Sequence, residues 1–215
     1  GEIDAALENK LPDLIRDDDL KGVFHMHSEF SDGSITLEQI CKSLIDEGFL
    51  YGGISEHSRS AYYANGLKIE DIDKYFDAID SLNDKYTNFK LFKGIESDIL
   101  VDGSLDYPDE ILKKFDFIIA SVHSNFNLDE DQMTQRVIKA LENKYTTILG
   151  HPTGRLLLSR QAYNIDMQKI INAAAQNSKA IEINASPYRL DLDWRLCKYA
   201  KDKGVKIFID RKSVV

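Results

Sequence analysis

The chain has 215 residues, of which 43% are hydrophobic, and its formal net charge is −9. This length can bury one sizeable core, so we expect one principal domain. No run of about 18 apolar residues could cross a membrane, and the N-terminus lacks the basic and apolar layout of a signal peptide. These features predict a cytoplasmic protein without a membrane segment, and the acidity argues against an autonomous nucleic-acid-binding domain.

Residues 1–20 differ in character from the rest of the chain. Apolar side chains form a short stripe between Ile3 and Leu14, and the acidic run Asp17–Asp19 follows it. We interpret this segment as a linker helix that leads into a domain spanning residues 21–215.

From residue 21 onward, runs rich in Val, Ile and Phe alternate with stretches of helical period, which is typical of β/α units around a parallel sheet. The expected strands are Gly22–His27, Tyr51–Ser55, Lys90–Glu96, Phe115–Val122, Thr146–Gly150, Lys179–Asn184 and Val205–Ile209. The expected helices are residues 37–47, Ile69–Tyr86, Gln132–Glu142, Met167–Gln176 and Leu192–Lys203. Seven parallel strands with outer helices predict an α/β fold, either a distorted β/α barrel or an open doubly wound sheet.

All five histidines fall at or just beyond the carboxyl end of an expected strand. They are His25 and His27 on the first strand, His57 on the second, His123 on the fourth and His151 on the fifth. Active sites of parallel β/α folds are built at that edge, because its loops converge on one crevice. The joint placement therefore predicts a single histidine-rich site.

The first expected strand contains the sharpest local signal. His25 and His27 are two residues apart, so their side chains should point the same way and bind one ion together. Asp32 follows in a turn that could fold its carboxylate over the same end of the strand. Taken alone, each feature has an ordinary explanation, which is polar surface for the histidines and turn formation for Asp32.

Further strand ends add candidate ligands. Glu96 closes the third expected strand, and a proline directly after His151 fixes a turn that would hold its ring. His123 follows an apolar run, where a lone histidine is more often a core residue than a ligand. Imidazoles mixed with carboxylates suit Zn²⁺, Mn²⁺ or Fe. Cys41 and Cys197 show no metal-binding spacing, and we interpret both as core thiols.

Nucleophilic catalysis by a serine triad is the competing enzyme mechanism, since Ser58, Ser121 and Ser124 lie near histidines in the sequence. The sequence contains no Gly-x-Ser-x-Gly elbow, no Walker-type phosphate loop and no dinucleotide fingerprint. Metal chemistry is therefore favoured. The acidic net charge does not exclude a phosphate substrate, because divalent ions would make the site itself positive.

Motifs spread over nearly the whole chain give it a resemblance to a known family. They are the leader Gly1–Leu7, His25-Met26-His27 with Ser31-Asp32-Gly33, Ser55–Ser58, Gly94–Glu96, Ser121–Ser124, His151–Leu157, Glu182–Ala185 and Arg189–Leu192. On these residues the chain resembles PHP (polymerase and histidinol phosphatase) domains, and in particular the domain at the C-terminus of bacterial family X DNA polymerases.

The resemblance implies a distorted seven-stranded β/α barrel, related to the TIM barrel, that binds up to three divalent ions (Zn, Mn or Fe) at its carboxyl face. The implied ligand sets are His25, His27 and Glu96 for one ion, Asp32 and His57 for a second, and His123 and His151 for a third, with Glu96 able to bridge. Glu96, His25 and His27 would stand at the centre of catalysis.

The implied activity is that of a metal-dependent phosphoesterase, with 3′–5′ exonuclease action on DNA ends as the leading hypothesis. Arg155 and Arg189 follow strand ends and are candidates for binding substrate phosphates, although surface solvation would explain both equally well. A polymerase domain upstream of this chain is an implied partner. The alternatives are a degenerate, non-catalytic module beside a polymerase and a small-molecule phosphatase of the histidinol-phosphatase type.

Two positions depart from the family pattern. Glu56 stands where an aspartate is usual before the second histidine, which adds a methylene and leaves its supporting role open. Family members close the last strand with an Asp-x-His pair, whereas this chain has Asp210 followed two residues later by Lys212. We therefore expect an altered site for the second ion and a barrel truncated at its C-terminus, and this departure motivates the non-catalytic alternative.

Overall fold

The computed structural model describes residues 1–210, and Lys212 lies outside the described residues. Seven strands form one sheet in which each strand pairs in parallel with the next along the chain. The strands are β1 (Gly22–Met26), β2 (Tyr51–His57), β3 (Lys90–Asp98), β4 (Phe117–Ser121), β5 (Ile148–Leu149), β6 (Ala180–Asn184) and β7 (Ile207–Asp210). This uninterrupted order lacks the reversal that defines a doubly wound sheet.

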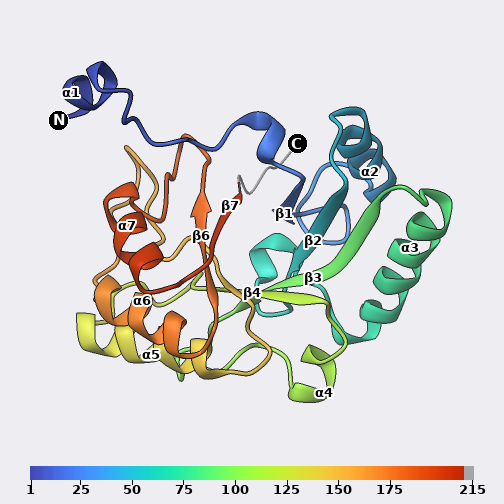
Figure 1. Ribbon diagram of the computed structural model, residues 1–215. Helices are drawn as coiled ribbons and strands as arrows, with labels where there is room; N and C mark the ends of the chain where they lie inside the picture. The colour runs from blue at the N-terminus through green and yellow to red at the C-terminus, as the bar shows by residue number, and fades with distance from the viewer. Residues whose placement is uncertain (211–215) are drawn as a thin grey trace.

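The sheet curls until its first and last strands approach each other (Figure 1). The ring of Phe24 on β1 lies 5.5 Å from that of Phe208 on β7, measured between centroids. Phe24 also contacts Phe117 on β4 at 4.9 Å and Phe92 on β3 at 5.9 Å. Side chains of four strands can meet in this way only inside a curved sheet, so the nearly closed seven-stranded barrel is confirmed and the open sheet is excluded.

Helices connect the strands and cover the outside of the barrel (Figure 1). They are α2 (Leu37–Asp46), α3 (Ile72–Lys85), α4 (Asp109–Leu112), α5 (Glu130–Glu142), α6 (Met167–Gln176) and α7 (Trp194–Asp202), preceded by the short α1 (Glu2–Leu7). The buried faces of α2 to α7 pack against the outward side chains of the strands in one continuous core. Within residues 1–210, no helix combines the length and the apolar character that a bilayer-spanning segment requires.

Several boundaries differ from those expected, for local reasons. The expected helix Ile69–Tyr86 divides into a 3₁₀ turn (η3, Ile69–Asp71) and α3. Helix α5 begins two residues early because the side chain of Asp129 accepts a hydrogen bond from the Gln132 amide at 2.8 Å. In the leader, the α-helix ends at Leu7, so the expected linker helix is shorter than predicted.

Candidate metal centre

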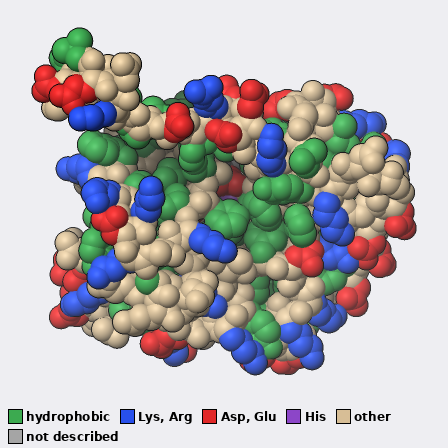
Figure 2. Space-filling model, in the orientation of Figure 1, with side chains coloured by type: hydrophobic (Ala, Val, Ile, Leu, Met, Phe, Trp, Pro, Cys, Tyr) green, Lys and Arg blue, Asp and Glu red, His purple; other side chains and the backbone are tan. Residues whose placement is uncertain are grey.

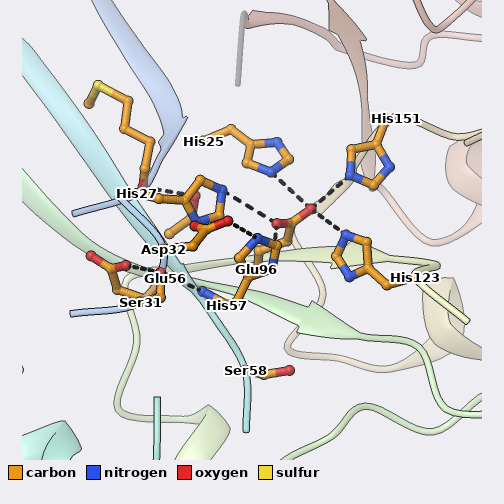
Figure 3. Close-up of polar contacts among 12 residues, drawn as sticks. His25, His27, Ser31, Asp32, Glu56, His57, Ser58, Glu96, His123 and His151 are labelled. Carbon is orange, nitrogen blue, oxygen red and sulfur yellow. Dashed lines mark hydrogen bonds and ion pairs between the residues drawn. The ribbon is translucent and has the colours of Figure 1, made fainter. Parts of the chain in front are cut away.

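The predicted ligands converge at the carboxyl rim of the barrel (Figure 3). This follows from the topology, because all seven strands run in the same direction and therefore end at the same edge. Glu96, near the carboxyl end of β3, lies at the centre of the group and is fully buried. The five histidine side chains around it are at most 9% exposed, and Asp32 reaches solvent with 36% of its side chain exposed.

One oxygen of Glu96 faces three imidazoles. Its Oε1 atom lies 2.8 Å from Nε2 of His151, 2.9 Å from Nε2 of His25 and 3.2 Å from Nε2 of His123. These three histidines come from β1 and from the loops after β4 and β5. Residues more than a hundred positions apart in the sequence thus present the same ring atom to one carboxylate oxygen.

The other oxygen of Glu96 faces a second pair of rings. Its Oε2 atom lies 3.2 Å from Nδ1 of His57 and 3.5 Å from Nε2 of His27. These two rings stack with their centroids 4.3 Å apart. On their far side, the Asp32 carboxylate lies 3.7 Å from Nδ1 of His27 and 3.6 Å from Nε2 of His57. Both rings are therefore placed between two carboxylates.

The donor atoms have the chemistry and spacing of metal ligands. Two ligand atoms bound about 2.0–2.1 Å from a tetrahedral zinc ion lie about 3.3 Å apart, and the distances given above bracket this value. Three groups have their ligand atoms within 4.8 Å of one another, which fits several ions. They are His25 with Glu96 and His151, His27 with Asp32 and His57, and His57 with Glu96 and His123.

The grouping differs from the one that the resemblance implied. His25 and His27 approach opposite oxygens of Glu96, because β1 is irregular between Val23 and Met26 and His25 has a φ of 63°. Regular strand alternation therefore does not describe this pair, although their rings are only 5.5 Å apart. The assignment of each residue to a particular ion remains a prediction.

Two carboxylates that we did not single out from the sequence support the histidines. Glu182, on β6, approaches Nδ1 of His25 with Oε1 at 2.8 Å and accepts a hydrogen bond from the His151 backbone amide with Oε2. Asp98, on β3, lies 2.6 Å from Nδ1 of His123. Such contacts fix the ring orientation and leave Nε2 facing the site. Asp98 is two residues after Glu96 on the same strand, and this period of two was the available signal.

The electrostatic environment strongly favours a cation at this position. Burial alone lowers the pKa of His25, but the neighbouring Glu96 and Glu182 outweigh it and raise the pKa to about 10. A metal ion would have to displace this proton, so metal binding at His25 is coupled to proton release.

Glu56 supports the loop that presents Asp32. Its carboxylate accepts hydrogen bonds from the backbone amide of Ser28, at 3.0 Å, and from the hydroxyls of Ser28 and Ser31. Burial raises the pKa of Glu56 to about 7. Gly33 is required in this loop, because a Cβ atom there would collide with the carbonyl of His27. Glu56 therefore orients the Asp32 loop from behind.

The two predicted phosphate-binding arginines have different surroundings. The guanidinium of Arg155 donates to the carbonyls of Arg189 and Leu190 and lies 3.2 Å from Asp193, so it connects two loops. In contrast, Nη1 of Arg189 is buried and has no hydrogen-bond partner among residues 1–210. Asp210, at the end of β7, is buried at the same rim. Phosphate binding by either arginine remains a prediction, and the surroundings favour Arg189.

Comparison with known proteins identifies the family. The PHP domain model matches residues 24–186, which carry all of the predicted ligands. The chain belongs to the PHP family. It is similar to the DNA polymerase/3′-5′ exonuclease PolX of Bacillus subtilis, to which it is 41% identical over 198 residues. That match covers 92% of this chain and 35% of PolX, so the chain spans about a third of the length of this relative.

Two other matches cover most of both chains. A probable phosphatase of Thermoanaerobacter is 32% identical over 187 residues, which cover 77% of this chain and 74% of that protein. Histidinol phosphate phosphatase of Lactococcus lactis, solved with zinc, L-histidinol and phosphate, superimposes with a TM-score of 0.69 at 22% identity. The superposition covers 90% of this chain and 86% of that structure. The PHP barrel fold is thereby confirmed, and the chain is a PHP-domain phosphoesterase with clustered ligands for several metal ions.

Proposed function

We propose that this PHP domain hydrolyses phosphodiester bonds at DNA ends, as a 3′–5′ exonuclease, with divalent ions held by His25, His27, Asp32, His57, Glu96, His123 and His151. The main support for metal binding is that the two carboxylate oxygens of Glu96 face five imidazole nitrogens at 2.8–3.5 Å. The similarity to PolX over 92% of the chain supports DNA as the substrate. By the same similarity, a polymerase domain in the full-length protein is the proposed partner.

The residues of the site would have different roles in this reaction. Divalent ions bound here, whether Zn, Mn or Fe, would activate water for attack on phosphorus and neutralise the phosphate charge. Glu96, His25 and His27 would form the catalytic centre, with Glu96 placed to bridge ligand groups. Arg189 would donate its buried Nη1 to a substrate phosphate, because that donor has no hydrogen-bond partner within residues 1–210.

A small-molecule phosphatase is the second candidate. The alignment with the probable phosphatase of Thermoanaerobacter covers most of both proteins, and the same ligands would permit hydrolysis of phosphate monoesters. A third candidate is a non-catalytic module, because Lys212, two residues after Asp210, stands where the resemblance implies a histidine.

One set of assays separates these candidates. The first assay follows release of nucleotides in Mn²⁺ as stepwise shortening of a 5′-labelled oligonucleotide from its 3′ end. Shortening that His151→Ala abolishes and the exposed control Gln176→Ala retains supports the exonuclease. Hydrolysis of histidinol phosphate or p-nitrophenyl phosphate without release from DNA would instead support the small-molecule phosphatase. Fewer than two bound ions per chain and no hydrolysis of any ester would support the non-catalytic module.

A further inference from the structure

A cavity lies beside the metal centre. It has a volume of about 490 Å³ and is lined by Phe30, Arg59, Tyr62, Lys68 and Lys74, among others. Its walls continue directly from the site, since Phe30 precedes Asp32 by two residues and Arg59 follows His57 by two. None of the lining residues belongs to the ligand groups. The PHP chemistry therefore leaves this cavity unexplained.

Two tyrosines connect the cavity to the metal centre. Tyr62 and Tyr63 form the 3₁₀ turn η2 (Tyr62–Ala64) and are 88% and 71% exposed. The ring of Tyr63 lies 6.0 Å from that of His57 and 6.4 Å from that of His123, while Tyr62 lines the cavity. Their turn is anchored, because Ala61 and Ala64 are buried. The rings of Tyr62 and Tyr63 are thus exposed to solvent on an anchored turn.

The cavity also carries cationic side chains. Lys68 and Lys74 are exposed, and Nζ of Lys74 lies 5.9 Å from the centroid of the Phe30 ring. Arg59 is engaged by Asp106, with Nε 3.3 Å from Oδ1. The lining also contains two acids, Glu29 and Asp71, and Asp106 offsets the charge of Arg59, so Lys68 and Lys74 are the remaining cations. In a chain with a net charge of −9, this lining is close to neutral, and its two exposed lysines are the groups that can bind an anionic ligand.

The surface around the barrel opening has the same mixed character. Figure 2 shows hydrophobic side chains, a class that includes tyrosine, gathered beside Lys and Arg side chains around a hollow near the middle of this face. Apolar and cationic groups therefore lie side by side where a ligand would approach the rim.

We propose that the path from Tyr63 over Tyr62 to Lys68 and Lys74 is a groove for single-stranded polynucleotide, which delivers a strand end to the metal centre. This inference rests on the proposed function and specifies its substrate. Exposed aromatic faces bind unpaired bases by stacking, and neighbouring cations bind the phosphates by charge. A duplex keeps its bases stacked on one another, so it would not use the tyrosines.

Binding can be measured separately from hydrolysis. The probe is a fluorescent, phosphorothioate-linked hexathymidylate, which resists cleavage, and the readout is its anisotropy with metal-loaded protein. Tyr62→Ala should raise the Kd about tenfold, and Tyr62→Phe should restore binding, because the ring does the stacking. The double variant K68A/K74A should lower the slope of log Kd against log salt by about 1.4, at about 0.7 per lost phosphate contact on a single strand.

Two exposed lysines provide a matched control. Lys90 begins β3 and Lys206 precedes β7, so both lie at the amino ends of the strands, opposite the metal centre. K90A/K206A removes the same charge and should leave the salt slope unchanged. No binding by the wild type, or equal effects of the two double variants, would overturn the groove. Nucleotide release by the wild type is scored separately, so loss of the exonuclease activity alone would contradict the proposed function and not the groove.

Discussion

Nδ1 of His25 lies 2.8 Å from Oε1 of Glu182, and the second oxygen of the same carboxylate accepts a hydrogen bond from the backbone of His151. An ionised carboxylate only accepts hydrogen bonds, so the contact places a proton on Nδ1. Nε2 of His25 then faces Glu96 at 2.9 Å with the geometry of a metal ligand. Glu182 on β6 thus orients two predicted ligands, one on β1 and one in the loop after β5.

Glu182→Gln should weaken metal binding without unfolding the protein. The amide keeps an acceptor for the His151 backbone, but the charge that fixes His25 is lost, and such supporting contacts are worth about 10–100-fold in metal affinity. Competition with a chromogenic chelator measures this affinity. Glu142→Gln, on the exposed end of α5, is the control and should bind metal as the wild type does. Equal affinities for all three proteins would show that Glu182 is not a positioning residue.

Glu96→Gln should reduce hydrolysis of any phosphate ester by at least about 100-fold and remove more than one bound ion. The reason is that Glu96 belongs to two of the three ligand groups. Steady-state kinetics with Mn²⁺ and elemental analysis of the dialysed protein measure the two effects. An active variant with an unchanged metal content would contradict the central place of Glu96.

Asp191 predicts a pH-dependent stability. Burial raises the pKa of Asp191 from 3.8 to about 6, although the Thr153 amide donates to its carboxylate at 3.0 Å. The folded state therefore binds this proton more tightly than the unfolded state, and the resulting stabilisation, present below about pH 4, is lost as the pH rises through 6. The full effect corresponds to about 3 kcal/mol, at about 1.4 kcal/mol per pKa unit.

Asp191→Asn should flatten this dependence, because the amide cannot ionise and still accepts from Thr153. Urea unfolding at pH 4 to 8 gives the free energy of unfolding for the wild type, for Asp191→Asn and for the exposed control Asp131→Asn. The stability of the Asp191→Asn variant relative to the wild type should increase between about pH 4 and 6 and stay constant above that range. A parallel pair of curves would rule out Asp191 as the titrating group.

Tyr75 couples α3 to two strands. It is fully buried, and its hydroxyl lies 3.1 Å from the carbonyl oxygens of both Ile54 on β2 and Gly94 on β3. Tyr75→Phe should lower the free energy of unfolding by about 1–2 kcal/mol, because the buried hydrogen bond is lost. Thermal unfolding measures this change, and the exposed Tyr188→Phe should have almost no effect. A loss below about 0.3 kcal/mol would contradict the assigned hydrogen bond.

Local patterns predicted seven parallel strands and the members of the ligand cluster, but they left a barrel and an open doubly wound sheet as alternatives, and only the family resemblance implied the barrel. Apolar runs mark the strands, and a histidine after such a run must lie at the carboxyl rim whatever the loops do. The grouping around Glu96 could not be predicted, since it depends on how side chains from five segments point across the barrel. The backbone irregularity at His25 illustrates this, because its φ of 63° departs from strand geometry.

The supporting residues were missed for a different reason. Glu182 and Asp98 are acids at strand ends, where exposed carboxylates are common, and only their contacts with His25 and His123 distinguish them. Arg155, in contrast, was singled out as a candidate for phosphate binding because it follows a strand end. In the structure its guanidinium donates to backbone carbonyls of the neighbouring loop.

The number of divalent ions bound per folded chain tests the metal centre most directly. After equilibration with Mn²⁺ or Zn²⁺ and removal of free ions, elemental analysis of the wild type should find two or three ions, in line with the three ligand groups. His151→Ala should bind at least one ion fewer. A folded wild-type chain that retains less than one ion would contradict the metal centre and the hydrolysis proposed for it.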